Sequence, residues 1–143
     1  MVKVTPERDM DRHMQDIPPQ IGPHEGRELD LMLAGEKPAA MFSDVVPASM
    51  TLPEAEFQPH VDAGRLVMKE DILRDKTKRF LPSRFVYYAL PQEAWRIDVL
   101  RKINRLLFQD GYKTNEITEY MIGFLLGYSD EDVGVYISRF FNK

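Results

Sequence analysis

A run of apolar residues in the middle of the chain, from Phe85 to Leu90, limits the folds that this sequence can adopt. The run is rich in aromatic and β-branched residues, which favour a β-strand. Successive side chains of a strand point to opposite faces, so a strand that is apolar at every position has to be covered on both faces. We therefore expect residues 84–90 to form the central strand of a sheet.

A second strand is expected directly before this run. Residues 64–70, extending as far as Leu73, combine apolar with charged residues. The link 75–83 is polar and basic, and its length suits a hairpin loop somewhat longer than average. We therefore expect an antiparallel hairpin over residues 64–90. A further strand is expected at residues 39–42, whose sequence is Ala-Ala-Met-Phe.

Helical patterns lie on both sides of the hairpin. Acidic residues and an apolar stripe at helical spacing indicate one short helix, and a capping-box pattern indicates another. These two helices are expected over Pro23–Ala34 and from Thr51 to about Phe57. Three helices are expected after the hairpin, over residues 91–109, 114–126 and 129–141.

The helix expected over residues 91–109 has the clearest apolar stripe of the chain. Four of its residues repeat at four- and three-residue steps, as the core-facing side of an amphipathic helix does. They are Trp95, Val99, Ile103 and Leu106, and the stripe is widened by Ile97, Leu100 and Leu107. We expect this stripe to face the core.

Grouped strands followed by grouped helices indicate an α+β fold. We expect a small, mostly antiparallel sheet of about three strands, with the central hairpin 64–90, packed against a C-terminal group of three helices. The length of 143 residues fits a single domain, for which we expect residues 23–143. Residues 1–22 have several prolines and few large apolar residues. Such a segment buries too little surface to offset its ordering entropy, so a disordered or loosely docked tail is expected.

The composition excludes several kinds of site. The chain has no cysteine, so it has no disulfide, no thiolate nucleophile and no cysteine-ligated zinc or iron–sulfur cluster. No apolar run approaches the ~20 residues of a membrane span, and no signal-peptide pattern is present. We expect a cytoplasmic protein without a cofactor. The three histidines lie far apart in the sequence, and no metal site is expected.

Charge is distributed unevenly along the chain. The net charge of −4 divides into −7 for residues 1–64, +6 for residues 65–105 and −3 for residues 106–143. A basic segment between acidic ones is compatible with a basic face that binds nucleic acid or an acidic protein.

A cluster of reactive side chains lies at the start of the first expected helix, in His24-Glu25-Gly26-Arg27-Glu28. His24 has the chemistry of a general base that Glu25 could orient, and Arg27 could hold an anion at a helix N-terminus. The alternative is a charged helix start with Glu–Arg pairs and no ligand. His60 is a further candidate catalytic residue, although it stands alone in a connecting segment.

The link of the hairpin has the composition of a binding loop for phosphates or carboxylates. Its cations can neutralise phosphates, and its aromatic rings can stack on bases. The cations are Arg74, Lys76, Lys78, Arg79 and Arg84, with Phe80 and Phe85 among them. The alternative is a solvated loop whose charges keep a neighbouring apolar strand from aggregating.

The last two expected helices resemble a helix-turn-helix unit over about 20 residues. Gly123 is followed four residues later by Gly127, and Val133 follows six residues after that. The second helix begins with Ser-Asp-Glu-Asp, and three carboxylates where that motif enters the major groove would repel phosphates. We therefore favour an αα-corner in which Gly127 permits a tight turn.

No assembled catalytic motif accompanies these features. The sequence has no glycine-rich phosphate loop, no Gly-x-Ser-x-Gly and no His-Glu-x-x-His. Our first hypothesis is a non-enzymatic protein-interaction or regulatory domain, with another protein as its partner. One alternative is a nucleic-acid-binding protein that uses the basic hairpin 74–85. Another is a small enzyme or ligand-binding protein with a site around His24–Glu28.

Overall fold

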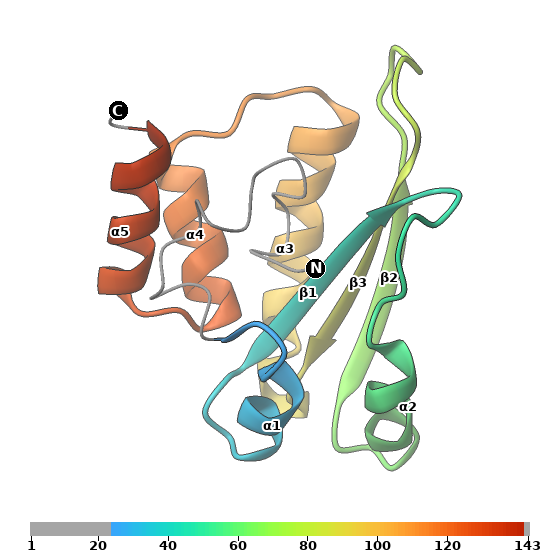
Figure 1. Cartoon of the computed structure of the whole chain (residues 1–143), viewed down its shortest axis with the longest axis vertical. Coiled ribbons are helices and arrows are strands. Elements are labelled where there is room, and N and C mark those ends of the chain that lie inside the picture. The colour runs from blue at the N-terminus through green and yellow to red at the C-terminus, as the bar shows by residue number, and fades with distance from the viewer. Residues whose placement is uncertain (1–23, 142–143) are drawn as a thin grey trace.

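The computed structural model describes residues 24–141, and the tail expected at residues 1–22 lies outside them (Figure 1). Its helices and strands follow one another as α1 (Glu28–Leu33), β1 (Ala39–Val45), α2 (Glu54–Asp62), β2 (Val67–Leu73), β3 (Ser83–Ala89), α3 (Trp95–Asn104), α4 (Glu116–Leu126) and α5 (Asp130–Phe141). A 3-10 turn, Pro91–Glu93, leads into α3, and a π-helical turn, Arg105–Gln109, continues it. Among the helices of residues 24–141, none has the length and apolar character needed to cross a membrane.

The sheet has the expected central strand. β3 lies between β1 and β2 and pairs antiparallel with both, so that Ala89 is opposite Ala39 on one side and Val67 on the other. Residues Phe85 to Ala89 are all buried. The antiparallel hairpin and the α+β fold are therefore confirmed.

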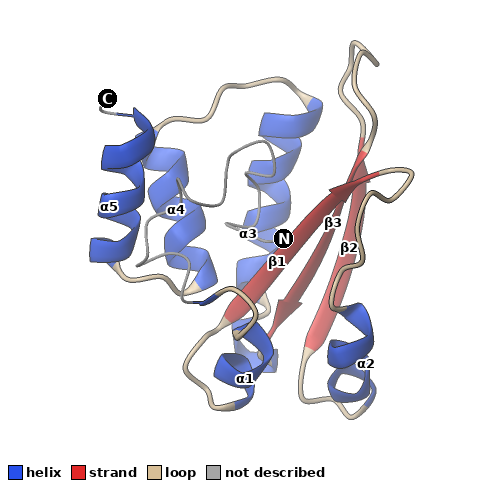
Figure 2. Cartoon of the chain, in the orientation of Figure 1, coloured by secondary structure: helices blue, strands red, loops and turns tan. Residues whose placement is uncertain are grey.

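Helices cover both faces of this sheet (Figure 2). On one face, Phe85 and Tyr87 pack in a core with residues of α3, α4 and α5, among them Leu100 and Leu126. On the other face, Val86 and Tyr88 pack with side chains of α1 and α2. These include Met32 of α1 and Phe57 of α2, and Phe42 of β1 lies in the same core. The alternation along β3 thus sends successive side chains into two separate cores.

β1 is longer than its apolar sequence indicated. It continues through Ser43 and Asp44, which pair with Phe85 and Arg84 of β3. The Asp44 carboxylate accepts hydrogen bonds from the backbone N–H groups of Val45, Ser49 and Met50. A buried carboxylate at the end of the strand is therefore satisfied by the loop that follows it.

α2 also differs from the expected helix. It begins at Glu54 without a side-chain cap and continues through Pro59 to Asp62. The capping box expected at Thr51 is therefore absent. Phe57, which is buried in the second core, and Glu54, which pairs with Arg84 of β3, fix this helix against the sheet.

The orientation predicted for α3 is wrong in part. Trp95 and Leu106 were expected in the core, but 47% and 48% of their surfaces are exposed. The buried residues of α3 are Ile97, Leu100, Ile103 and Asn104. α3 is therefore rotated about its axis, so that Ile97 and Leu100 face the core and Trp95 does not.

Polar contacts with the sheet fix this rotation. Asn104, which is fully buried, donates from Nδ2 to the Tyr87 hydroxyl at 3.1 Å. Arg101 makes two hydrogen bonds with the Asp71 carboxylate of β2, at 3.0 and 2.9 Å. Buried polar groups that lose their partners cost about 1–3 kcal/mol each. These contacts therefore favour the observed rotation of α3 over one that would bury Trp95.

α4 and α5 pack closely through two glycines. Gly127, with φ +88°, ends α4 and lies against Pro38, which leaves no room for a side chain. Gly123 lies against the Val133 side chain of α5, so a Cβ at this position would overlap it. Ser129 Oγ accepts a hydrogen bond from the N–H of Asp132 at the start of α5.

We expect Gly123→Ala to destabilise the fold by about 1–3 kcal/mol, because the new methyl group overpacks against Val133. Chemical unfolding followed by circular dichroism measures this change. Gly134→Ala is the matched control: it lies in α5, where the nearest atom is the half-exposed Tyr120 hydroxyl at 3.2 Å, and its effect should stay below about 1 kcal/mol. Val133→Ala should relieve the loss in the double variant, and a purely additive double variant would contradict this packing.

Candidate functional site

Five large apolar side chains of α3 and α4 form an exposed surface, which we call the aromatic face. It consists of Trp95, Ile117, Tyr120, Met121 and Phe124. Trp95 is 47% exposed and Phe124 is 56% exposed. Scattered exposed apolar residues are ordinary, but a contiguous group that includes several aromatic rings marks a binding surface.

The sequence of α4 produces this face because it is apolar on two sides. Ile117, Met121 and Phe124 follow helical spacing and point away from the core, while Ile122 and Leu126 are buried. Tyr120 lies over Gly134 of α5, where a Cβ would come within 3.2 Å of its hydroxyl. A surface helix needs one apolar stripe to dock on its core, and the buried residues of α4 supply it, so the second stripe is left largely exposed.

Arg96 joins α3 to α4 at one end of the aromatic face. Its guanidinium carbon lies 4.8 Å from the ring centre of Trp95 and 5.0 Å from that of Phe124. Nη1 donates to the Phe124 carbonyl at 2.8 Å, and Nε donates to Glu93 at 2.7 Å. The two rings are therefore held in place by a cation that is itself fixed by hydrogen bonds.

Exposed carboxylates lie near the end of the aromatic face that holds Trp95 and Phe124. Asp98 follows Trp95 by one turn, and Asp130 and Glu131 begin α5 directly after the α4–α5 turn. At the opposite end of the helix pair the exposed charges have both signs: the cations Lys102, Arg105 and Lys113 and the carboxylates Asp110 and Glu116. Exposed carboxylates therefore predominate only at the end where the two rings lie.

The basic hairpin is a second candidate surface. Arg74, Lys76, Lys78 and Arg79 are exposed on the β2–β3 loop, which projects beyond the end of the sheet (Figure 1). Arg84, the fifth predicted residue, has a different role. Its guanidinium donates to both carboxylate oxygens of Glu54 at 2.7 Å and to Glu70, and these partners raise its pKa.

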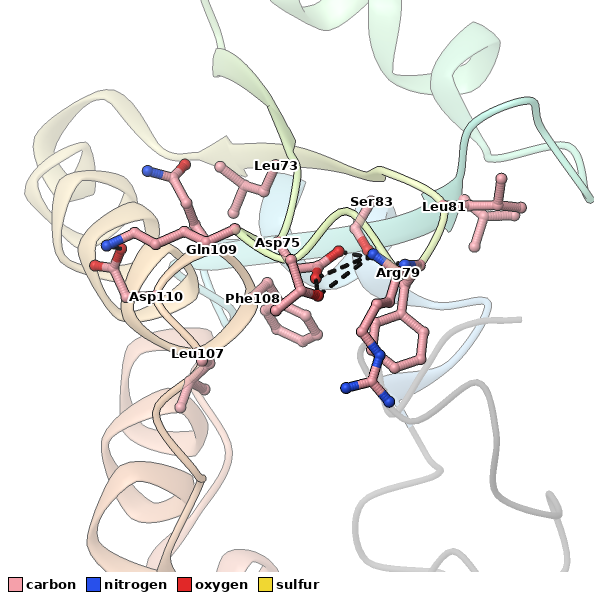
Figure 3. Close-up of a pocket in the computed structure, with 14 residues that line it drawn as sticks. Leu73, Asp75, Arg79, Leu81, Ser83, Leu107, Phe108, Gln109 and Asp110 are labelled. Carbon is pink, nitrogen blue, oxygen red and sulfur yellow. Dashed lines mark hydrogen bonds and ion pairs between the residues drawn. The ribbon is translucent and has the colours of Figure 1, made fainter.

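A cavity of about 640 Å³ lies between this loop and the end of the α3 helix. Figure 3 shows Phe108, Gln109 and Asp110 on one side and Arg79, Leu81 and Ser83 on the other. Lys76 spans the two sides through an ion pair with Asp110 at 3.1 Å.

His24 lies in a cluster that joins the start of the described chain to the α4–α5 turn. Its ring stacks on Tyr128 with ring centres 4.1 Å apart, and its Nδ1 accepts a hydrogen bond from Lys37 Nζ at 3.0 Å. Lys37 is fully buried and also donates to the Leu126 carbonyl at 2.5 Å, at the C-terminal end of α4. An ammonium group in that position is stabilised by the helix dipole.

These contacts leave His24 without the lone pair that a general base needs. The pKa of His24 is lowered to about 3, first by burial and then by the positive charges of Lys37 and Arg27. Burial raises the pKa values of Glu25 and Glu28. The geometry therefore favours a structural role for this cluster. An active site around His24 would also need a second polar side chain, and Lys37 supplies one.

The remaining predicted residues are placed apart from this cluster or at the surface. Arg27 is exposed. His60 lies at the end of α2, where its Nδ1 accepts from Arg65 Nε at 3.1 Å and its carbonyl accepts from the N–H groups of Arg65 and Leu66. His60 thus closes the turn between α2 and β2. Within residues 24–141, no group of three or more histidine or carboxylate side chains is arranged to hold a metal ion.

The sequence did not identify the aromatic face. Trp95 was assigned to the core because its spacing fitted the stripe of α3. The available signal was in α4, which carries seven apolar side chains between Ile117 and Leu126, more than one buried side of an 11-residue helix needs.

No protein-family model, curated protein or solved structure matches this chain significantly.

We expect the His24 ring to stay neutral across the physiological range, so its NMR shifts should be constant between about pH 5 and pH 8. In the unfolded chain histidine takes up its proton near pH 6.5, whereas the folded pKa is about 3. The free energy of unfolding should therefore fall as the pH is lowered from about 6.5 toward 3.

His24→Phe keeps the stacking on Tyr128 and removes the titrating group, so it should flatten this decrease. Lys37→Met should raise the pKa of His24, because it removes a nearby positive charge. A His24 ring that titrates near pH 6.5 in the unsubstituted protein would contradict the buried contact with Lys37.

Proposed function

We propose that this chain is a protein-interaction domain and that its aromatic face binds a basic amphipathic helix of another protein. The observation that carries the proposal is the exposure of Trp95 and Phe124 on the two sides of Arg96. These two rings lie at one end of an apolar surface that the fold does not use for its own core.

The residue types of this surface support the proposal. Interface cores are enriched in tryptophan, tyrosine, phenylalanine, methionine and arginine, and the aromatic face with Arg96 contains all five. Tryptophan, tyrosine and arginine are also the residues that most often dominate binding energy. Because Arg96 holds Trp95 and Phe124 in place, little side-chain entropy is lost when a partner covers them.

Shape and charge support a helical partner with basic residues. The exposed side chains of α4 form a stripe at the spacing of one helix face, and an amphipathic helix presents anchors at matching spacing. Asp98, Asp130 and Glu131 border the aromatic face where the two rings lie. Lysine or arginine beside the apolar anchors of the partner would complement these carboxylates and increase the association rate.

Trp95 allows a direct test, since it is the only tryptophan of the chain. Two 18-residue amphipathic helical peptides serve as probes, one of leucine and lysine and one of leucine and glutamate. We expect the lysine peptide to shift the Trp95 emission to shorter wavelength and to bind more tightly than the glutamate peptide. Phe124→Ala should weaken this binding by about 10- to 30-fold, the effect of losing a side chain that contributes about 1.4–2 kcal/mol.

Ile72→Ala is the matched control. Ile72 is 58% exposed on β2, away from the aromatic face, and its loss should leave peptide binding unchanged. The double variant Asp130→Lys/Glu131→Lys should remove the preference for the lysine peptide. Equal effects of Phe124→Ala and Ile72→Ala would show that the aromatic face is not the binding surface.

A further inference from the structure

We propose that the basic hairpin and the cavity beneath it bind single-stranded nucleic acid, with phosphates on the hairpin cations and a base in the cavity. This surface lies on the β2–β3 loop and the end of α3, and it is distinct from the aromatic face. The inference is therefore independent of the proposed protein interaction, and either one can fail without the other.

The loop holds a fixed conformation before any ligand binds. The Asp75 carboxylate accepts hydrogen bonds from the Thr77 hydroxyl and from the backbone N–H groups of Arg79 and Phe80. Lys78 takes the left-handed backbone conformation, with φ 58°, at the turn. A loop that is ordered by its own hydrogen bonds loses less entropy when it binds.

The cations of the loop are available to phosphates. Arg74, Lys76, Lys78 and Arg79 are exposed within six consecutive positions. Lys76 is paired with Asp110, but its side chain is 72% exposed, and an ion pair in that setting contributes about 0–1 kcal/mol. Lys76 can therefore exchange this carboxylate for a phosphate at little cost.

The two carboxylates at this surface do not cancel its charge. Asp75 is occupied by the hydrogen bonds of its own loop, which hold its pKa below the usual range. Asp110 is bound by Lys76. Four cations against these two anions leave the surface positive, as phosphate binding requires.

The cavity suits a nucleobase. Its volume of about 640 Å³ lies within the range of small-ligand sites, about 300–1,000 Å³. Two aromatic rings line it, those of Phe80, which is 68% exposed, and of Phe108. Ser83 and Gln109 add hydroxyl and amide groups that can bond to base edges. The Arg79 guanidinium lies 5.8 Å from the Phe80 ring, so a cation and a stacking surface are adjacent.

These features favour a single strand over the other polyanions. A duplex keeps its bases stacked, and its readers insert a helix or a strand into a groove. An anionic membrane would use the cations and the exposed Phe80 and Leu81 side chains but would have no use for the cavity. Only a strand with unstacked bases uses the cations, the rings and the cavity together.

Fluorescence anisotropy with a fluorescein-labelled 20-nucleotide oligothymidylate tests the proposal on the full chain. We expect binding at about 50 mM salt that weakens as salt is added, because each phosphate contact contributes about −0.7 to the slope of log affinity against log salt. Lys78→Glu/Arg79→Glu should lower the affinity at least 10-fold and reduce this slope by about 1.4. The double variant Lys69→Glu/Lys102→Glu, at exposed lysines outside the loop, is the charge-matched control.

Phe80→Leu separates stacking from simple burial of an apolar side chain. It should lower the affinity for the oligonucleotide about 5- to 10-fold, since stacking on an aromatic ring contributes about 1–3 kcal/mol per base. Phe80 is exposed, so the variant should unfold at the same denaturant concentration as the unsubstituted protein.

Three results would overturn the proposal: no binding of the oligonucleotide at 50 mM salt, equal losses in the hairpin double variant and in the lysine control, or an undiminished affinity of Phe80→Leu. Vesicles of phosphatidylserine and phosphatidylcholine provide the last comparison. Binding to these vesicles without binding to the oligonucleotide would assign the hairpin to a lipid surface instead.

Discussion

The fold depends on the need to cover β3 on both of its faces. This strand is hydrogen-bonded along both edges and buried from Phe85 to Ala89, so both faces of that stretch have to be covered. One face is covered by the C-terminal helices and the other by α1 and α2. Each of these helices uses one apolar side for this purpose. Surfaces that remain apolar or strongly charged after both faces are covered are the ones free to bind other molecules, and the two candidate surfaces are of this kind.

The contacts between α3 and the sheet explain why an aromatic face exists. α3 has apolar side chains over a wide arc, from Trp95 and Val99 to Ile97 and Leu100. Asn104 on Tyr87 and Arg101 on Asp71 favour the rotation that buries Ile97 and Leu100. Once α3 takes that rotation, Trp95 lies outside the core next to Phe124, and Arg96 fixes both rings. A structural requirement of the core therefore determines the position of the proposed binding surface.

Two of the candidate site residues, His24 and Arg84, form contacts that join elements of the fold. His24 and Lys37 connect the start of α1 to the α4–α5 turn. Lys37 donates to the carbonyl of Leu126, the last residue of α4. Arg84 connects β3 to α2 through Glu54. Both arrangements satisfy buried or half-buried polar groups, which a small sheet covered on both faces has to accommodate. The same residue types at the hairpin loop, Lys76, Lys78 and Arg79, remain at the surface because that loop extends beyond the sheet.

Patterns along the sequence predict most of the local structure: the central strand 84–90, the hairpin, the three helices after it and the cations of the loop. Strand and helix periods, turn residues and charge are properties of neighbouring positions, so they can be read along the chain. Contacts formed in the folded chain, and no local pattern, fix which side of α3 is buried, which partners Arg84 binds and which residues surround His24. The contacts responsible join residues far apart in the chain. Arg101 and Asp71 are 30 positions apart and Lys37 and Leu126 are 89 positions apart, and no local pattern records that these groups meet.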